Sequence, residues 1–269
     1  MFINIFAKNL LIIMISSKFI GIIPARFAST RLPGKPLSKI GNKTMIQLVY
    51  ERISSILEHV VVATDDQRII DKVQSFGGKA VMTSEHHKSG TSRCAEALEI
   101  INKTENIKFD VVINIQGDEP FIVKEQLFKI MKCFENPGTQ IATLIKKTNS
   151  FDDIFNPSKP KVIVNTKMEA IYFSRSPIPY VRDVEKEEWA LKHNFYTHIG
   201  IYAYTTDCLR EIVKLSQSSL EKAESLEQNC WIENNYKIIT DITDFESFSI
   251  DTPADLEKAQ IIFMENENK

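Results

Sequence analysis

Short apolar runs alternate in the first half of the chain with segments whose apolar residues recur at helical spacing. The continuous runs 19–24, 59–64 and 109–116 are typical of strands buried on both faces of a sheet. Helical spacing at 44–57, 66–77 and 91–102 predicts amphipathic helices between them. Further strands at 79–83 and 140–147 and a helix at 124–134 continue the alternation. This rhythm predicts an α/β fold with a mostly parallel sheet covered by helices.

The pattern changes beyond about residue 150. The runs 161–165 and 169–174 flank a short turn and predict an antiparallel hairpin inserted into the α/β fold. We expect the surrounding subregion, about 155–205, to cover the substrate or to form a dimer arm. Strands are then expected at 198–205 and 236–240, with helices at 207–215, around 225–233 and at 253–263. Residues 19–269 are expected to form a single domain.

Residues 1–18 are interpreted separately. Their apolar run after Lys8 resembles a weak signal peptide, but it is shorter than the roughly 20 residues that span a bilayer, and no small-residue cleavage site follows it. The alternative that we favour is an N-terminal extension or an over-long start, with Met14 as the initiator.

Composition and charge narrow the class of protein. Apolar residues make up 43% of the 269 residues, enough for a buried core, and the formal net charge of -2 provides no global attraction for nucleic acid or an anionic membrane. Cys94, Cys133, Cys208 and Cys230 form no CxxC pair, so neither a zinc knuckle nor a disulfide framework is indicated. We expect a cytoplasmic enzyme with reduced thiols and without stable membrane association or a nucleic-acid partner.

A cationic loop follows the first predicted strand. Arg26, Arg31 and Lys35 lie within ten residues of each other, among Pro33, Gly34 and Pro36. Ligands of open parallel sheets bind at the carboxyl ends of strands, so these cations indicate an anion site, although a solvated basic loop is the alternative. The loop matches neither the P-loop nor the dinucleotide fingerprint. A polyphosphate, such as a nucleoside triphosphate, fits three cations.

Two acidic segments could complete this site. Asp118 follows the strand that ends in Gln116 and Gly117, and carboxylates there suit Mg²⁺, which also takes phosphate oxygens and water. A turn in which Asp118 caps the next helix is the alternative. Asp251 is expected at the end of a late strand, with Thr252 free to cap the following helix.

The ordered motifs of the chain resemble the 3-deoxy-manno-octulosonate cytidylyltransferases, or CMP-Kdo synthetases. The resemblance covers about residues 19–264 and rests on "IIPARFASTRLPGKPL", "VVATDD", "HKSGTSRCAEA", "NIQGDEPFI", "FNPSKPKVI", "YFSRSPIPY", "HIGIYAY", "LEQ" and "DTPADLEKA". It implies a three-layer nucleotide-diphospho-sugar transferase fold, similar to glycosyltransferase A. It also implies a homodimer that uses CTP, Kdo and Mg²⁺ to make CMP-Kdo for lipopolysaccharide biosynthesis.

The resemblance also implies roles for individual residues. Arg26 and Lys35 would bind the CTP phosphates and act in catalysis together with Asp118, while Arg31 and Arg93 would support the nucleotide. Asp118 and Asp251 would hold Mg²⁺. The residues implied for the sugar acid are Gln116, Arg175, His198, Tyr202, Glu227 and Gln228.

Two alternative functions stay open, and the sequence departs from the family pattern at two places. The substrate could be another acidic sugar, such as amino-Kdo or a sialic acid, or the chain could be a non-catalytic nucleotide-binding module. After "LEQ" this chain continues with "NCWIENN" where the family typically has a leucine and an arginine, and Ser249 replaces a common glycine. These departures concern the contacts after Gln228 and the turn before Asp251.

Overall fold

The computed structural model describes residues 19–267, so the predicted extension at 1–18 lies outside the described residues. The chain divides into two compact units, the first formed by Met1–Lys124 with Ser247–Lys269 and the second by Glu125–Glu246. The single domain expected over 19–269 stays a prediction. No helix in the described part of the chain combines the length and apolar character needed to cross a membrane.

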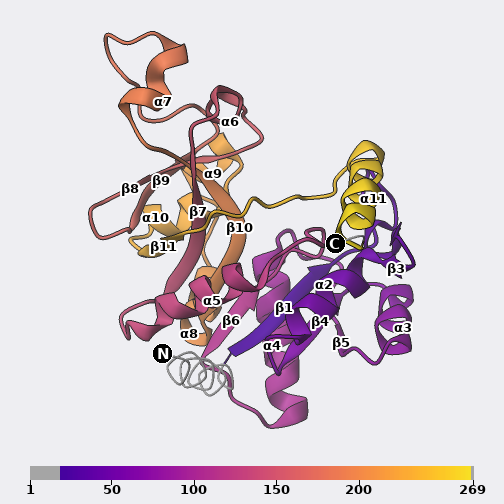
Figure 1. Ribbon diagram of the computed structural model, residues 1–269. Coiled ribbons are helices and arrows are strands. Elements are labelled where there is room, and N and C mark those ends of the chain that lie inside the picture. The colour runs from indigo at the N-terminus through magenta and orange to yellow at the C-terminus, as the bar shows by residue number, and fades with distance from the viewer. Residues whose placement is uncertain (1–18, 268–269) are drawn as a thin grey trace, which may run out of the picture. The chain divides into compact units, whose positions relative to one another are not determined.

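The first unit contains a four-stranded parallel sheet in the order β6-β1-β4-β5 (Figure 1). The strands of this unit are β1 (Phe19–Ala25), β2 (Lys39–Ile40), β3 (Lys43–Thr44), β4 (Val60–Thr64), β5 (Ala80–Met82) and β6 (Val111–Asn114). β2 and β3 pair with each other, antiparallel, outside the four-stranded sheet. Its helices are η1 (Lys35–Leu37), α2 (Met45–Ser54), α3 (Gln67–Ser75), α4 (Gly90–Glu105) and α11 (Pro253–Glu267). The predicted alternation of buried strands and helices is confirmed in this unit.

The direction of the crossovers explains how helices cover both faces of this sheet. β1, α2, β4, α3 and β5 advance in one direction across it, whereas α4 returns from β5 to β6 on the other side of β1. Because parallel crossovers are right-handed, α2 and α3 lie on one face and α4 on the other. β4 and β6 are buried at every position, as expected for strands covered on both faces.

The second unit has a mixed sheet in which β7 pairs in parallel with β11 and antiparallel with β10. Its strands are β7 (Ile141–Thr148), β8 (Lys161–Val164), β9 (Ala170–Ser174), β10 (Phe195–Thr205) and β11 (Ile238–Ile242). Its helices are α5 (Lys124–Lys132, which begins at the boundary), η2 (Cys133–Glu135), α6 (Phe151–Phe155), η3 (Lys186–Glu188), α7 (Trp189–Lys192), α8 (Thr206–Ile212), α9 (Ser219–Glu224) and α10 (Glu227–Glu233). The antiparallel pairing of β8 with β9 confirms the predicted hairpin.

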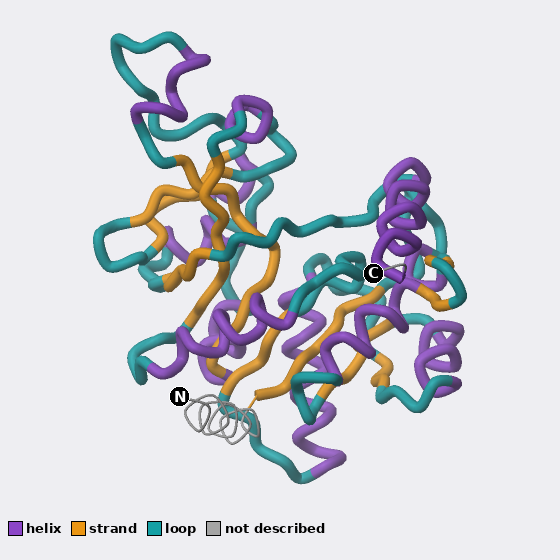
Figure 2. The backbone as a smooth tube through the Cα atoms, in the orientation of Figure 1, coloured by secondary structure: helices purple, strands orange, loops and turns teal. Residues whose placement is uncertain are grey.

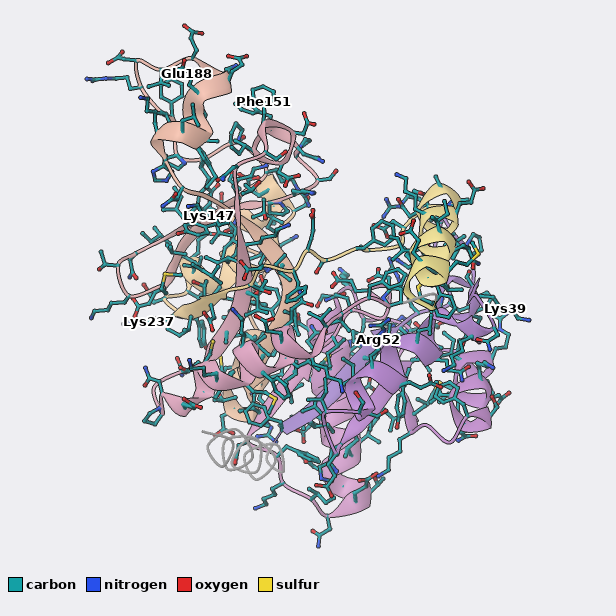
Figure 3. All side chains as sticks on the ribbon, in the orientation of Figure 1. Lys39, Arg52, Lys147, Phe151, Glu188 and Lys237 are labelled. Atoms are coloured by element: carbon teal, nitrogen blue, oxygen red, sulfur yellow. The ribbon has the colours of Figure 1, made fainter. Side chains whose placement is uncertain are left out.

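An aromatic cluster packs the segments on either side of the hairpin. Trp189 is 2% exposed and packs with Ile154 and Phe195. Phe155 lies between Trp189 and Phe151, and the Phe151 ring, labelled in Figure 3, stacks on Phe155 at 4.5 Å and remains 43% exposed. This cluster gives the 150–195 region a small apolar core of its own.

Candidate active site

The loop after β1 is held in shape by a glycine and an aromatic ring. Gly34 has a left-handed φ of +68°, and a Cβ at this position would lie 3.1 Å from the Phe27 ring. The Arg68 guanidinium lies 3.4 Å from the centroid of the same ring, and the Gly34 amide donates to the Phe27 carbonyl at 3.1 Å. The loop is therefore folded back on itself, and Lys35 begins the short helix η1.

Lys35 is the meeting point of the two predicted metal ligands. Its Nζ lies 2.6 Å from Asp118 Oδ2 and 3.0 Å from Asp251 Oδ1. Arg31 Nη2 lies 3.1 Å from the same Asp251 oxygen, but the Arg31 side chain is 62% exposed, against 15% for Lys35. Arg26 is exposed on the same loop. The structure thus brings together cations and carboxylates that are far apart in the sequence.

A glycine lets the loop after β6 approach β1 closely. A Cβ at Gly117 would lie only 2.9 Å from the carbonyl oxygen of Pro24, a backbone atom of β1. The close approach places Asp118 beside Lys35, well before α5 begins at Lys124. The alternative interpretation of Asp118 as a helix cap is therefore wrong.

The prediction that Asp251 ends a strand is also wrong. Residues 243–252 form neither helix nor strand (Figure 2). Its residues 247–250 are linked instead to the loop after β6, from the Ile250 amide to the Asp118 carbonyl at 3.0 Å and from Ser247 Oγ to Glu119 Oε2 at 2.8 Å. Because these contacts form no repeating ladder, the segment is extended without being part of the sheet.

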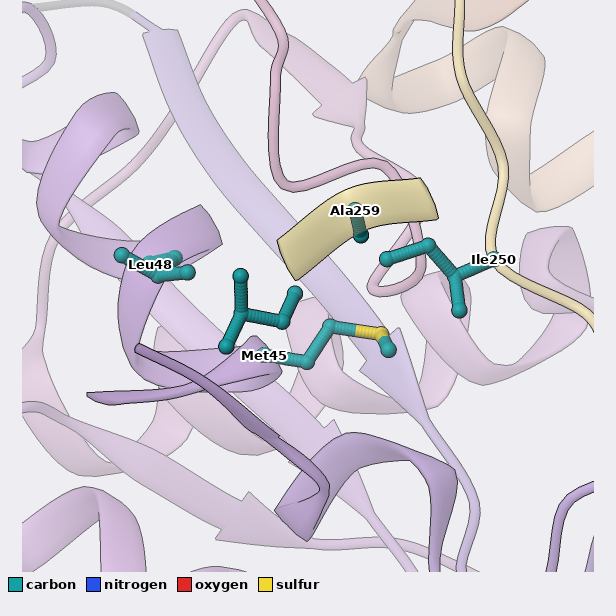
Figure 4. Packing of buried hydrophobic residues seen from close by; sticks show 5 residues of the cluster. Met45, Leu48, Ile250 and Ala259 are labelled. Atoms are coloured by element: carbon teal, nitrogen blue, oxygen red, sulfur yellow. The ribbon is translucent and has the colours of Figure 1, made fainter. Parts of the chain in front are cut away.

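Apolar packing fixes the same segment next to α2 and α11. Ile250 is fully buried and clusters with Met45 and Leu48 of α2 and with Ala259 of α11 (Figure 4). This contact anchors the residue directly before Asp251. The position of the second carboxylate is therefore set by the packing of the first unit's core.

Side chains at the start of α11 accept hydrogen bonds from the backbone amides there. Thr252 Oγ1 accepts a hydrogen bond from the Asp255 amide at 3.2 Å, as predicted, and Asp255 Oδ2 accepts from the Thr252 amide at 2.9 Å. The Asp251 carboxylate is left to face Lys35 and Arg31. Ser249, which replaces a common glycine, does not have a positive φ, so the turn does not require glycine here.

Burial and the neighbouring charges shift the pKa of Lys35 in opposite directions. Burial lowers the pKa of Lys35, but the carboxylates of Asp118 and Asp251 outweigh it, and the pKa of Lys35 is raised overall. The neighbouring Glu119 is 9% exposed, and its burial, helped by the Asp118 charge, raises its pKa to about 7. Lys35 is therefore a cation at neutral pH, while the Glu119 carboxyl group takes up a proton more readily than an exposed one.

A cavity of about 310 Å³ opens beside these groups. It is formed entirely by residues of the first unit: Pro24, Ala25, Arg26, Ser29, Thr30, Arg31, Lys35, Pro36, His87, Lys88, Ser89, Gly90, Arg93, Gln116, Gly117, Asp118 and Asp251. The site residues that we predicted within this unit all line it. The cavity lies at the loops that follow β1 and β6, where parallel sheets bind ligands.

Arg93 lines the cavity, and two hydrogen bonds within the protein hold its guanidinium in place. Nη2 donates to Asp65 Oδ2 at 2.6 Å and Nη1 donates to Thr83 Oγ1 at 2.7 Å, and the residue is 3% exposed. Asp65 and Thr83 follow β4 and β5, so Arg93 ties the ends of two strands to α4. The sequence pattern did not reveal this role of Asp65 and Thr83.

His87 is another cavity residue that we did not single out. Its Nε2 lies 2.5 Å from Glu96 Oε2 and its Nδ1 lies 3.1 Å from Ser92 Oγ. Ser89 caps α4 by accepting a hydrogen bond from the Ser92 amide. The segment "HKSGTS" contains a recognisable cap signal, a serine directly before a helix, which could have indicated this wall of the cavity.

The carboxylates of this site suit Mg²⁺ better than a metal whose ligands all come from the protein. Within residues 19–267 no three His, Cys, Asp or Glu side chains gather at one point. The two carboxylates of Asp118 and Asp251 do converge on a single cationic atom, Lys35 Nζ. Mg²⁺ commonly binds one or two carboxylates and completes its shell with water and substrate phosphates, so these residues fit that ion.

Of the predicted sugar-acid residues, Gln116 lies in the first unit and all the others lie in the second unit. Arg175 follows β9 and donates to the Glu224 carbonyl through Nε at 2.8 Å and to the Pro157 carbonyl through Nη1 at 3.0 Å. The Glu224 carboxylate accepts from Ser174 Oγ at 2.6 Å and from the Arg175 amide at 2.9 Å. Much of the donor capacity of Arg175 is thus used within the protein.

His198 and Tyr202 lie on β10, with their ring centroids 5.1 Å apart. Burial lowers the pKa of His198 to about 3, and burial together with the Glu227 charge raises the pKa of Tyr202 well above its ordinary value. The Tyr202 hydroxyl oxygen is buried and has no hydrogen-bond partner within the described residues. A buried polar atom of this kind is rare unless a ligand or water completes its bonding.

Glu227 and Gln228 begin α10, and the residues that follow them fasten this helix to the sheet. The Asn229 side chain accepts from the Phe173 amide at 3.2 Å and donates to the Phe173 carbonyl at 2.9 Å. Trp231 packs edge-on against Tyr202 at 5.2 Å. The segment "NCWIENN" therefore packs α10 against β9 and β10.

Comparison with known proteins identifies the family of the chain. A sequence model of the cytidylyltransferase family matches residues 20–238. The 3-deoxy-manno-octulosonate cytidylyltransferase of Phocaeicola vulgatus is 54% identical over 255 residues, which cover 94% of this chain and 100% of the relative. The protein of the same name from Parabacteroides distasonis is 55% identical over 253 residues, which cover 93% of this chain and 99% of the relative.

Solved structures are similar in fold as well. A CMP:2-keto-3-deoxy-manno-octonic acid synthetase in complex with CTP superimposes with a TM-score of 0.83 at 42% identity, covering 93% of this chain and 99% of the other. A putative glucose-1-phosphate thymidylyltransferase from Bacillus anthracis, with a TM-score of 0.63 at 18% identity, shares the fold alone. The predicted α/β fold is confirmed as one that nucleotidyltransferases share.

Proposed function

Because this chain belongs to the 3-deoxy-manno-octulosonate cytidylyltransferase family, we propose that it transfers CMP from CTP to Kdo and releases pyrophosphate. The observation that carries the proposal is the cavity in which Arg26, Arg31 and Lys35 face Asp118 and Asp251. We further propose that the product serves lipopolysaccharide biosynthesis and that the enzyme acts in the cytoplasm as a homodimer.

The cationic side of the cavity suits the triphosphate of CTP. Lys35 is nearly buried, so its charge is weakly screened, and charge-assisted hydrogen bonds to phosphate contribute on the order of 1.5–3 kcal/mol each in such places. Arg26 and Arg31 are exposed on the same loop and can reach an incoming ligand. Arg93 would shape the nucleotide side of the cavity through its bonds to Asp65 and Thr83.

Asp118 and Asp251 would hold Mg²⁺ in this proposal. The bound ion would supply Lewis-acid polarisation of the α-phosphate. In the structure both carboxylates are already arranged around a positive charge, the Lys35 ammonium. When CTP binds, Lys35 would exchange a carboxylate for a phosphate oxygen and stay a cation, because its pKa is raised.

The reaction joins the anomeric oxygen of Kdo, which loses its hydroxyl proton, to the α-phosphorus of CTP and breaks the bond from that phosphorus to the bridging oxygen of the departing pyrophosphate. Phosphoryl-transfer enzymes act mainly by positioning and by neutralising charge. Arg26 and Lys35 would stabilise the charge that develops on the pyrophosphate. For the sugar acid, the second unit offers Arg175, His198, Tyr202, Glu227 and Gln228, and the unpartnered Tyr202 hydroxyl supports a polar ligand there.

A pyrophosphate-release assay tests the proposal. Purified protein with Mg²⁺ and Kdo should release pyrophosphate with CTP and much less with UTP, ATP or GTP. The Lys35→Ala variant should be strongly impaired, whereas Lys39→Ala, which removes an exposed lysine of β2 labelled in Figure 3, should behave like the wild type. CTP binding without release for any sugar acid would show a non-catalytic nucleotide-binding module instead.

A further inference from the structure

An irregularity in β10 lies beside His198. β10 and β7 pair with Ile199 opposite Leu144, and the next pair is Tyr202 opposite Thr143. Gly200 and Ile201 therefore have no opposite residue on β7, which makes this a bulge. Bulges interrupt the ladder and redirect nearby side chains, and they are frequent next to functional sites.

The side chain of Thr143 fills the gap that the bulge leaves. Thr143 is fully buried, and its Oγ1 lies 2.7 Å from the Ile201 carbonyl oxygen and 3.3 Å from that of Ile199. The same Oγ1 lies 3.0 Å from His198 Nε2. One hydroxyl thus meets two carbonyl groups and one imidazole nitrogen.

The number of protons decides the direction of these bonds. A hydroxyl group has a single proton, and carbonyl oxygens can only accept. The short distance to Ile201 requires the Thr143 proton there, so Thr143 Oγ1 must accept from His198 Nε2. His198 is therefore protonated at Nε2.

The remaining nitrogen of the ring is then an acceptor. Burial lowers the pKa of His198 to about 3, so the imidazole is neutral at physiological pH and Nδ1 carries a lone pair. Within residues 19–267, no hydrogen-bond partner is found for Nδ1. The residue is partly exposed, and its ring lies against the edge-on ring of Phe173 at 5.3 Å and against Tyr202.

We propose that Thr143 is a positioning residue that holds His198 in its Nε2–H tautomer, so that Nδ1 accepts a hydrogen bond from a hydroxyl group of the sugar acid. This inference rests on the proposed function, because it assigns His198 to the sugar. Thr143 itself is fully buried. It acts through the imidazole, in the way that the partner of one ring nitrogen fixes the state of the other.

Nitrogen NMR on the free protein tests the tautomer without any turnover. In protein labelled with ¹⁵N-histidine, with the His198 signals assigned from the His198→Gln variant, we expect a protonated Nε2 and an unprotonated Nδ1 from pH 5 to 9. Thr143→Ser, which keeps the hydroxyl, should give the same spectrum. Thr143→Val, which has a similar shape, should give averaged signals of a tautomer mixture.

Kinetics and titration test the contact with the sugar. Thr143→Val should raise the KM for Kdo by about tenfold, as for one lost hydrogen bond between neutral groups, while the KM for CTP stays unchanged. Adding Kdo to the wild type should move the Nδ1 signal in the direction of a hydrogen-bonded nitrogen. Circular dichroism checks that both variants fold, and if Thr143→Val does not, the wild-type and Thr143→Ser spectra still decide the tautomer.

The outcomes separate this inference from the proposed function. A protonated Nδ1 in the wild type, or a KM for Kdo in folded Thr143→Val equal to that of the wild type, would overturn the role of Thr143. A wild type that shows the expected tautomer but responds to Kdo in neither titration nor turnover would overturn both the sugar contact and the proposed function.

Discussion

Replacing Gly117 by alanine tests the close approach of the loop after β6 to strand β1. The new Cβ would lie 2.9 Å from the Pro24 carbonyl oxygen, and an ordinary contact begins at 3.4 Å, so the two segments must separate by about 0.5 Å. Overpacking of this kind costs about 1–3 kcal/mol. Taking about 2 kcal/mol, the melting temperature should fall by roughly 4–8 °C for a chain of this size.

The same separation should also affect the reaction. Gly117 directly precedes Asp118, and a misplacement of about 1 Å can cost on the order of a hundredfold in rate, so 0.5 Å should cost roughly tenfold in kcat/KM. Gly138→Ala is the matched control. Its Cβ would meet nothing closer than Asn136 Oδ1 at 3.5 Å, so melting and turnover should match the wild type.

Calorimetry measures the melting temperature of both variants, and the pyrophosphate assay measures their kcat/KM. If Gly117→Ala melts and turns over like Gly138→Ala, the loop after β6 is not in close contact with β1, and this contact does not place Asp118 beside Lys35.

Three further predictions concern charge and protonation. Asp118→Asn should bind Mn²⁺, used as a probe for Mg²⁺, at least tenfold more weakly by titration calorimetry with CTP present, whereas Asp244→Asn, an exposed control, should bind it as the wild type does. Glu119 has a folded pKa of about 7 against about 4.5 unfolded, so the folded state holds the extra proton and stability falls as pH rises through this window. Without metal, Glu119→Gln should therefore gain up to roughly 3 kcal/mol over the wild type at pH 8 and little at pH 4.5, measured by urea unfolding; an equal difference at both pH values would contradict the raised pKa. His198 gives the opposite slope: its pKa is about 3 folded and 6.5 unfolded, so the unfolded chain takes up the proton first and stability falls as pH drops below about 6.5, by up to about 1.4 kcal/mol per pH unit. His198→Gln should lack this component, and unfolding curves with the same pH dependence as the wild type would contradict it.

In the first unit, the apolar pattern was sufficient to predict the strands of the four-stranded sheet and the helices α2, α3, α4 and α11. β1, β4 and β6 are continuous buried runs, and the rule that ligands bind where parallel strands end pointed to the loops that now line the cavity. The geometry that joins the loops was not visible in the sequence. It depends on contacts between residues far apart, such as the Ile250 amide with the Asp118 carbonyl.

The errors have physical reasons. The segment before Asp251 has the apolar residues of a strand, but it is held by the bond of Ile250 and by core packing, and propensity cannot distinguish this from a ladder. We did not predict α9 because none of its residues is buried and it therefore has no apolar face. Its capping box, formed by Ser218 and Glu221, was present in the sequence and could have indicated it.

The sugar-acid residues of the second unit could not be derived from pattern alone. His198 and Tyr202 occupy positions of β10 that an ordinary buried strand would also fill with aromatic side chains. The resemblance to the family supplied their candidate role. The bulge at Gly200 and Ile201, which gives His198 its partner, requires knowledge of the strand register.

Direct detection of the product tests the central claim. Purified protein incubated with CTP, Kdo and Mg²⁺ should convert the CTP into pyrophosphate and a CMP sugar with a phosphodiester signal in ³¹P NMR, and should do so faster with Kdo than with amino-Kdo or a sialic acid. Formation of no phosphodiester with Kdo, by folded protein that binds CTP, would contradict the account.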